Sequence, residues 1–155
     1  MPPGSRLSLL FEFFATGQRV RTLVGEAMAG AALRSDDYAV YSVLFDDGPQ
    51  TPSDLARRVG MPPTTMSHYV RALLARGHAA REVVATDRRS YRLALTPEGL
   101  RAHAAASRAF READQRFMTA LEIDEDAARA MLAAIGTAAA IAESALIADS
   151  MEVAG

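Results

Sequence analysis

The sequence contains no cysteine and no lysine, and it has only three histidines among its 155 residues. Without cysteine there is no disulfide framework, no thiolate zinc site and no thiol-based redox switch. His68 and His78 lie on different predicted elements, His103 stands alone, and no His-x-x-x-His pair or carboxylate cluster completes a ligand set. The sequence also lacks a nucleophile motif and a glycine-rich phosphate loop. We therefore expect neither an enzyme nor a metal or other cofactor.

Long apolar runs are also scarce. Residues 7–14 are apolar enough to imitate the core of a signal peptide, but Glu12 interrupts them, only Arg6 precedes them and no small-residue cleavage site follows. No stretch is expected to reach the ~20 apolar residues of a membrane helix. The sequence predicts a cytoplasmic protein.

Charge is distributed unevenly along the chain, whose formal net charge is −2. Residues 54–92 hold eight arginines and three acids, whereas the remainder holds nine arginines and sixteen acids. A basic segment on an acidic body is the electrostatic pattern of a nucleic-acid-binding surface. Half of the residues are hydrophobic, which is enough for one moderate domain with helical extensions.

Two short helices joined by a tight turn are predicted in this basic segment. Thr51 caps the first helix, Pro52 takes its first position and Gly60 ends it. The second runs from about residue 63 to residue 76. This is the helix-turn-helix pattern, in which the second helix enters the DNA major groove N-terminus first. The apolar side of the second helix is formed by Met66, Val70, Leu73 and Leu74.

Two short alternating segments, residues 78–84 and 91–95, follow the second helix and predict a hairpin. The polar tip between them carries Arg88 and Arg89, and Thr96 then caps a new helix. Helix-turn-helix, hairpin with a basic tip, and helix are the elements of a winged helix.

These residues resemble the MarR family of bacterial transcription regulators. The resemblance rests on TPSDLA at 51–56, Gly60 in the turn, DRR at 87–89 and LALTPEG at 93–99. It implies a homodimer that binds a pseudo-palindromic DNA operator, with the wing arginine in the minor groove. Many family members respond to small aromatic or phenolic compounds. The chain departs from the family at Pro62, where a small polar cap is usual.

The candidate DNA contacts lie on the two helices and the wing. Arginine suits a narrow minor groove because negative potential is concentrated there, and Asp87 is interpreted as bracing the wing. Arg71 can grip guanine or phosphate. The alternatives are a solvated hairpin tip and an ordinary solvated helix face. The candidates are Ser53, Thr64, Thr65, Ser67, His68, Arg71, Arg88 and Arg89.

The flanking segments predict long helices over residues 6–32, 97–120 and 124–148. The first is apolar on two sides, which indicates burial between its own domain and a partner subunit, or alternatively packing within one monomer. The last is rich in alanine, and small residues let helices approach closely. We expect a helical dimerisation lobe formed by residues 1–33 and 100–155, and a winged helix over residues 34–99.

A ligand pocket is the second candidate site. Ser35 is expected to cap a helix with an aromatic stripe, and the helix over 97–120 carries polar residues on an otherwise apolar seam. These polar residues, including Asp114, either fix helix register or anchor a ligand. The candidate ligand-binding residues are Tyr38, Tyr41, Phe45, His103 and Ser107.

The sequence as a whole predicts a mostly helical α+β protein. Its expected function is that of a homodimeric, sequence-specific DNA-binding repressor, relieved by a small aromatic or phenolic ligand. The alternatives are a winged helix used for protein interaction and a ligand-binding protein without a DNA function.

Overall fold

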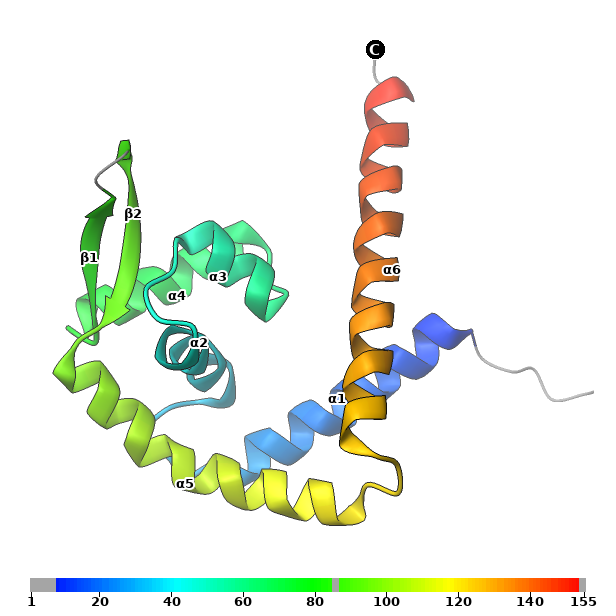
Figure 1. Cartoon of the computed structure of the whole chain (residues 1–155), viewed down its shortest axis with the longest axis horizontal. Coiled ribbons are helices and arrows are strands. Elements are labelled where there is room, and N and C mark those ends of the chain that lie inside the picture. The colour runs from blue at the N-terminus through cyan, green and yellow to red at the C-terminus, as the bar shows by residue number, and fades with distance from the viewer. Residues whose placement is uncertain (1–7, 85–86, 154–155) are drawn as a thin grey trace, which may run out of the picture. The chain divides into compact units, whose positions relative to one another are not determined.

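The computed structural model describes the backbone of residues 8–84 and 87–153, and the side chains of residues 8–83 and 91–150. It divides into two compact units, Met1–Gln115 and Arg116–Gly155, and the boundary falls within one helix. The mostly helical α+β fold class is confirmed (Figure 1). The elements are α1 (Leu9–Ala27), α2 (Ser35–Asp46), α3 (Pro52–Val59), α4 (Pro63–Ala75), β1 (Ala79–Val84), β2 (Asp87–Leu95), α5 (Pro97–Ala120) and α6 (Glu125–Val153).

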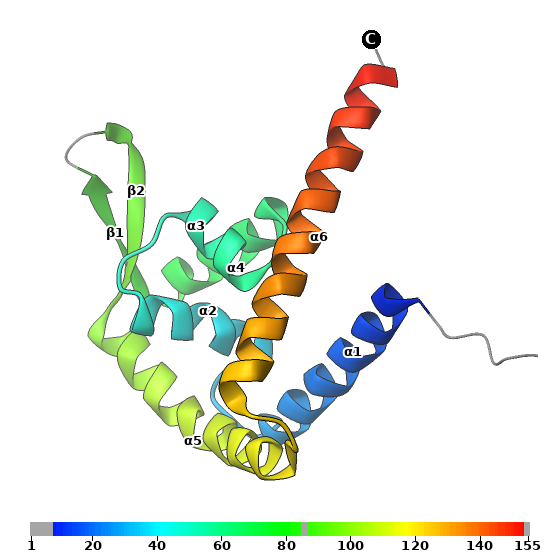
Figure 2. The ribbon, with the colours of Figure 1, turned by 45° about the vertical axis from the view of Figure 1, so that its right-hand side comes forward.

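The core of the first unit is built around α2, which contacts α1, α3 and β2. Tyr41 and Val40 of α2 are completely buried, as are Leu55 of α3 and Leu93 of β2. Because α4 packs on both α3 and β1, the helix-turn-helix and the hairpin share this core. Both ribbon views show the hairpin projecting beyond α2, α3 and α4 (Figures 1 and 2).

The hairpin is antiparallel, with Ala79 opposite Leu95 and Val83 opposite Tyr91. Its register shifts between Val83 and Val84, just before the tip. Gln50 exchanges two backbone hydrogen bonds with Leu93, of 3.1 and 2.7 Å. These two bonds connect the segment before α3 to β2. They hold the helix-turn-helix and the hairpin in a fixed position relative to each other.

The beginning of the chain differs from the sequence-based expectation. α1 ends at Ala27, about a turn before the expected end, because the segment after it folds onto the core and buries Met28 and Leu33. The expected cap at Ser35 is wrong: Arg34 holds the N-cap position without a side-chain hydrogen bond, and Ser35 is the first helical residue. The two acids that follow still lie in the first turn, at the positive end of the helix.

The second unit contains the end of α5 and the whole of α6. The start of α6 is capped by the Asp124 carboxylate, which accepts from the Ala127 N–H at 3.1 Å. Residues Glu125–Ser150 are long and apolar enough to cross a membrane, by length and composition only. The expectation that no stretch reaches this length is therefore wrong, because alanines fill the positions between the larger apolar residues. None of this stretch is buried within the described chain.

Candidate nucleic-acid interface and adjoining pocket

The helix-turn-helix starts at a well-formed cap. The Thr51 hydroxyl accepts from the Asp54 N–H at 3.2 Å and donates to the Asp54 carboxylate at 2.7 Å. The hydrogen bond from this hydroxyl is the largest cause of the lowered pKa of the Asp54 carboxyl. Gly60 ends α3 with φ of 71°, a left-handed conformation that favours glycine. Ser53 lies exposed in the first turn of α3, where its backbone N–H is free of helical partners.

The recognition helix α4 divides into two faces as expected. Met66, Val70 and Leu73 are buried, whereas the predicted DNA-contacting residues are exposed. The Ser67 hydroxyl donates to the Pro63 carbonyl at 2.9 Å, so it is left to accept from a base or a water. Pro62 provides no side-chain cap, which leaves the first N–H groups of α4 open. The exposed candidates on this helix are Thr64, Thr65, Ser67, His68 and Arg71.

The predicted hairpin is present, but β2 begins at Asp87, before the expected start at residue 91. The backbone of Arg88 and Arg89 therefore belongs to β2, and the segment between the two strands is residues 85–86. The side chains of Asp87, Arg88 and Arg89 lie outside the described residues. Their assignments as brace and groove contacts remain predictions.

A polar network that sequence reasoning missed fixes the end of α4 against α2. Arg76 pairs with the largely buried Asp37 at 3.4 Å, and the Tyr41 hydroxyl lies 2.8 Å from Nδ1 of His78. Burial raises the pKa of Tyr41, so its hydroxyl remains protonated. Tyr69 adds a third link, donating to Asp36 at 3.4 Å.

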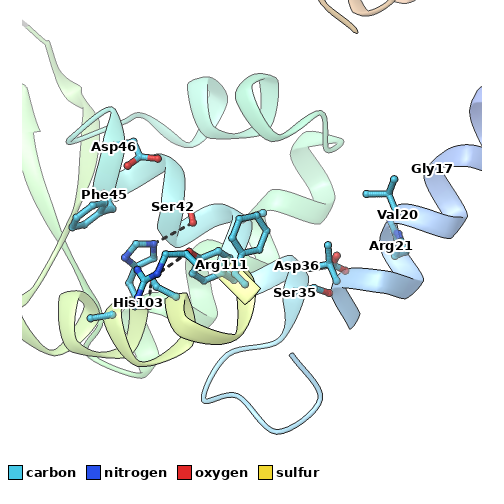
Figure 3. A pocket seen from close by; sticks show the side chains of 16 residues that line it. Gly17, Val20, Arg21, Ser35, Asp36, Ser42, Phe45, Asp46, His103 and Arg111 are labelled. Carbon is cyan, nitrogen blue, oxygen red and sulfur yellow. Dashed lines mark hydrogen bonds between the residues drawn. The ribbon is translucent and has the colours of Figure 1, made fainter. Parts of the chain in front are cut away.

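The second candidate site is a cavity of about 840 Å³ lined by α1, α2 and α5 within the first unit (Figure 3). Four of the five predicted ligand-binding residues line it: Tyr38, Phe45, His103 and Ser107. Tyr41 does not line it, because its side chain is turned to His78 instead. Asp114, the third polar residue of the seam, is exposed and does not line it.

His103 forms part of the cavity wall and is held between two aromatic rings. Its ring stacks on Tyr38 at 5.0 Å and on Phe45 at 4.6 Å between centroids, and Nε2 lies 3.2 Å from the Ser42 hydroxyl (Figure 3). Burial lowers the pKa of His103; Asp46 opposes this shift and Arg111 adds to it. The imidazole is therefore neutral at pH 7 and can still exchange hydrogen bonds.

Ser107 is already satisfied within the protein, since it donates to the His103 carbonyl at 2.8 Å and accepts from the Tyr38 hydroxyl at 3.2 Å. It positions Tyr38. The charged lining residues Arg21, Asp36, Asp46 and Arg111 were missed, because the sequence gives no sign that α1 and α5 converge on one cavity. Among the described residues no group of three histidines or acids could hold a metal.

Comparisons with known proteins agree with this geometry. Residues 37–77 match a family model described as winged helix-turn-helix DNA-binding. No curated protein matches the sequence. The PcaV transcriptional regulator of Streptomyces coelicolor, solved with its natural ligand, is 26% identical with a TM-score of 0.69, covering 88% of this chain and 99% of its own.

Two further solved structures are similar over most of the chain. A probable transcriptional regulator from Pseudomonas aeruginosa is 25% identical with a TM-score of 0.69, over 83% of this chain and 96% of its own. The Mycobacterium tuberculosis regulator MosR, solved with DNA, is 20% identical with a TM-score of 0.74, over 88% and 98%. All three of these solved structures are of transcription regulators.

Proposed function

We propose that this chain is a homodimeric repressor of the MarR family of winged-helix transcription regulators, which reads a pseudo-palindromic DNA operator and releases it when a small aromatic or phenolic ligand binds. The observation that carries the proposal is the exposed polar face of α4, which stands opposite a buried apolar face within a helix-turn-helix. The cytoplasm, where bacterial DNA lies, is the proposed location.

DNA binding is supported by charge as well as by shape. The segment from residue 54 to residue 92 carries an excess of five positive charges, although the whole chain is acidic. MosR and the Staphylococcus aureus regulator MepR, which share this fold, were solved in complexes with DNA.

The direct test is fluorescence anisotropy of a labelled mixed-sequence duplex titrated with the protein at several salt concentrations. A winged helix that contacts phosphates should bind more weakly as salt rises, with a linear fall of the logarithm of affinity. Absence of binding at 50 mM salt would instead favour a protein-interaction module or a ligand-binding protein without a DNA function.

Dimerisation is supported by apolar surface that the described chain leaves open. Leu10 on α1 is 79% exposed, and Leu146 on α6 is 68% exposed. Monomeric soluble proteins rarely leave such long apolar helix faces uncovered. We infer that residues 1–33 and 100–155 form the lobe through which two copies associate. Other exposed apolar residues on these helices include Leu9, Phe11, Phe14, Met131, Leu132, Ile141 and Ile147.

The dimer is therefore expected to have its two recognition helices about 34 Å apart, one turn of DNA. Multi-angle light scattering at micromolar concentration should give the mass of two chains. A mass of 16.6 kDa would contradict the proposal. A protein that is recovered only with detergent or vesicles would point to α6 as a membrane helix instead.

The cavity beside His103 supports the proposal that the ligand is a small aromatic or phenolic compound. Its walls combine aromatic rings with Arg21 and Arg111, whose donors suit a carboxylate or a phenolate, and with the acids Asp36 and Asp46. PcaV was solved with its natural ligand, CouR from Rhodococcus jostii with p-coumaroyl-CoA, and BpsR from Bordetella bronchiseptica is described as regulated by 6-hydroxynicotinic acid.

An aromatic acid that binds this cavity should raise the melting temperature and lower DNA affinity together, since both follow from its preference for one conformation. A ligand at 100 times its Kd would add about 2.7 kcal/mol of stability. His103→Leu should weaken both responses while leaving DNA binding without ligand unchanged, because it removes the stacked imidazole and its bond to Ser42.

A panel of benzoates, cinnamates and phenols screened by thermal shift and anisotropy tests this expectation. If no member changes either readout, His103 and Ser107 only fix helix packing. If His103→Leu abolishes DNA binding without ligand, the residue supports the fold rather than the response.

A further inference from the structure

A small groove of about 190 Å³ lies between the recognition helix and the base of the wing. Ser67 and Arg71 line it from α4, and Arg81 and Tyr91 line it from the hairpin. Its apolar lining consists of Pro52, Val70 and Leu74. Val70 is buried in the core. None of the residues that line this groove is acidic. The groove therefore presents two guanidinium groups to whatever approaches from the open side.

Of the two arginines, Arg71 belongs to α4 and Arg81 to the hairpin. The Tyr91 ring positions the Arg81 guanidinium. Its guanidinium carbon lies 4.6 Å from the centre of the Tyr91 ring. Arg81 stands opposite Leu93 in the register, so it shares the face of the sheet that turns toward the core. Stacking uses the flat face of the guanidinium and leaves the N–H groups at its edge available.

No carboxylate among the described residues pairs with Arg81. Glu82 follows it directly, but alternation along a strand sends that side chain to the opposite face, where it stands across from Arg92. Arg81 is exposed, so the N–H groups that stacking leaves free are open to a partner from outside the chain. An anion is the partner that this arrangement fits.

The position of the groove identifies the anion. A recognition helix enters the major groove and a wing enters the adjacent minor groove. In the DNA duplex, a sugar-phosphate backbone separates the major groove from the adjacent minor groove. A cation located between the helix and the wing therefore faces a phosphodiester.

We propose that Arg81, braced by Tyr91, binds a backbone phosphate of the DNA strand that passes between α4 and the wing. This inference rests on the DNA-binding function proposed above and assigns a contact that carries no base information. Arg71 strengthens the positive field from the helix side, while its own reach extends to the base edges. Tyr91 is a positioning residue, because it acts through Arg81 and not on DNA.

Arg81→Gln should weaken binding to a preferred duplex and to a scrambled duplex alike, by roughly tenfold each. The slope of log affinity against log salt should become shallower by about 0.9 for each lost phosphate contact, hence by about twice that for a dimer. The ratio of the two affinities should not change, since a phosphate contact does not read sequence.

Two substitutions of Tyr91 distinguish a role in positioning Arg81 from a role in folding. Tyr91→Phe keeps the aromatic face and should retain the wild-type salt slope, whereas Tyr91→Leu keeps apolar volume but loses the stacking and should shift the slope toward that of Arg81→Gln. Arg101→Gln is the charge control: it removes an exposed arginine that pairs with Glu98 on α5, and it should leave the slope unchanged.

Melting temperatures measured for every variant show that each one is folded. Inorganic phosphate at 10 mM is compared with chloride at equal ionic strength. If phosphate raises the melting temperature of the wild-type protein but not that of Arg81→Gln, while both proteins bind DNA equally, the site takes free phosphate and the inference is wrong.

If the wild-type protein binds DNA and Arg81→Gln keeps both its affinity and its salt slope, the inference also fails while the proposed function stands. A loss confined to the preferred duplex would overturn it too, because that is the signature of base reading. If the wild-type protein binds no duplex, the proposed function itself has failed.

Discussion

Replacing Gly99 by alanine is expected to destabilise the protein by about 1–3 kcal/mol, or more if the backbone cannot adjust. A Cβ at Gly99 would lie 2.0 Å from the carbonyl oxygen of His78 and 3.1 Å from a methyl of Leu95. The nearest atom belongs to the backbone, which cannot rotate away. The His78 carbonyl also accepts the N–H of Thr96 at 3.1 Å, so movement there would disturb the start of α5.

The same substitution at Gly17 is the matched control. Gly17 lies in the interior of α1, and nothing would approach an added Cβ within 4 Å. Alanine loses less conformational entropy than glycine in a helix, so Gly17→Ala should stabilise the protein by about 0.5–1 kcal/mol. Urea denaturation of both variants gives the comparison. Equal stability of Gly99→Ala and the wild-type protein would show that the close approach of α5 to His78 is wrong.

Arg89→Ala should weaken binding to every duplex and reduce any preference for A·T-rich flanks. A narrow minor groove attracts arginine through its negative potential, and A·T tracts have the narrowest groove. The backbone of Arg89 lies near the start of β2, next to Arg88. Anisotropy titrations with A·T-rich and G·C-rich flanks at fixed salt measure the effect.

Arg71→Ala provides the contrast for Arg89→Ala. Arg71 lies on the exposed face of α4, and if it reads a base its loss should cost about 1–3 kcal/mol on the operator and less on scrambled DNA. The two variants thus separate the wing from the recognition helix. If Arg89→Ala leaves both operator and scrambled affinities unchanged, the wing does not enter the groove.

The parts of the fold that local chemistry determines could be predicted from the sequence. The Thr51 cap and the glycine at the end of α3 specify that helix, and Pro97–Ala120 forms the helix expected after Thr96. Apolar spacing correctly separated the buried and exposed faces of α4. These features depend on neighbours within one or two helical turns.

Contacts between distant segments could not be predicted in this way. The tyrosine stripe of α2 was interpreted as one surface, yet Tyr38 lines the cavity while Tyr41 bonds to His78. Residues three apart on a helix differ in direction by about 60°, enough to face different neighbours. The bond of Arg76 to Asp37 and the entry of Arg21 into the cavity likewise depend on how helices cross.

In-vitro selection of bound duplexes from a random-sequence pool tests the central claim most directly. The wild-type protein should enrich a pseudo-palindrome whose half-sites are centred about 10 base pairs apart, one for each recognition helix of a dimer. Arg71→Ala, selected in parallel, should enrich the same spacing with weaker preference at the positions that Arg71 reads. A pool that remains random, or a single half-site without a symmetric partner, would contradict a dimeric, sequence-reading regulator.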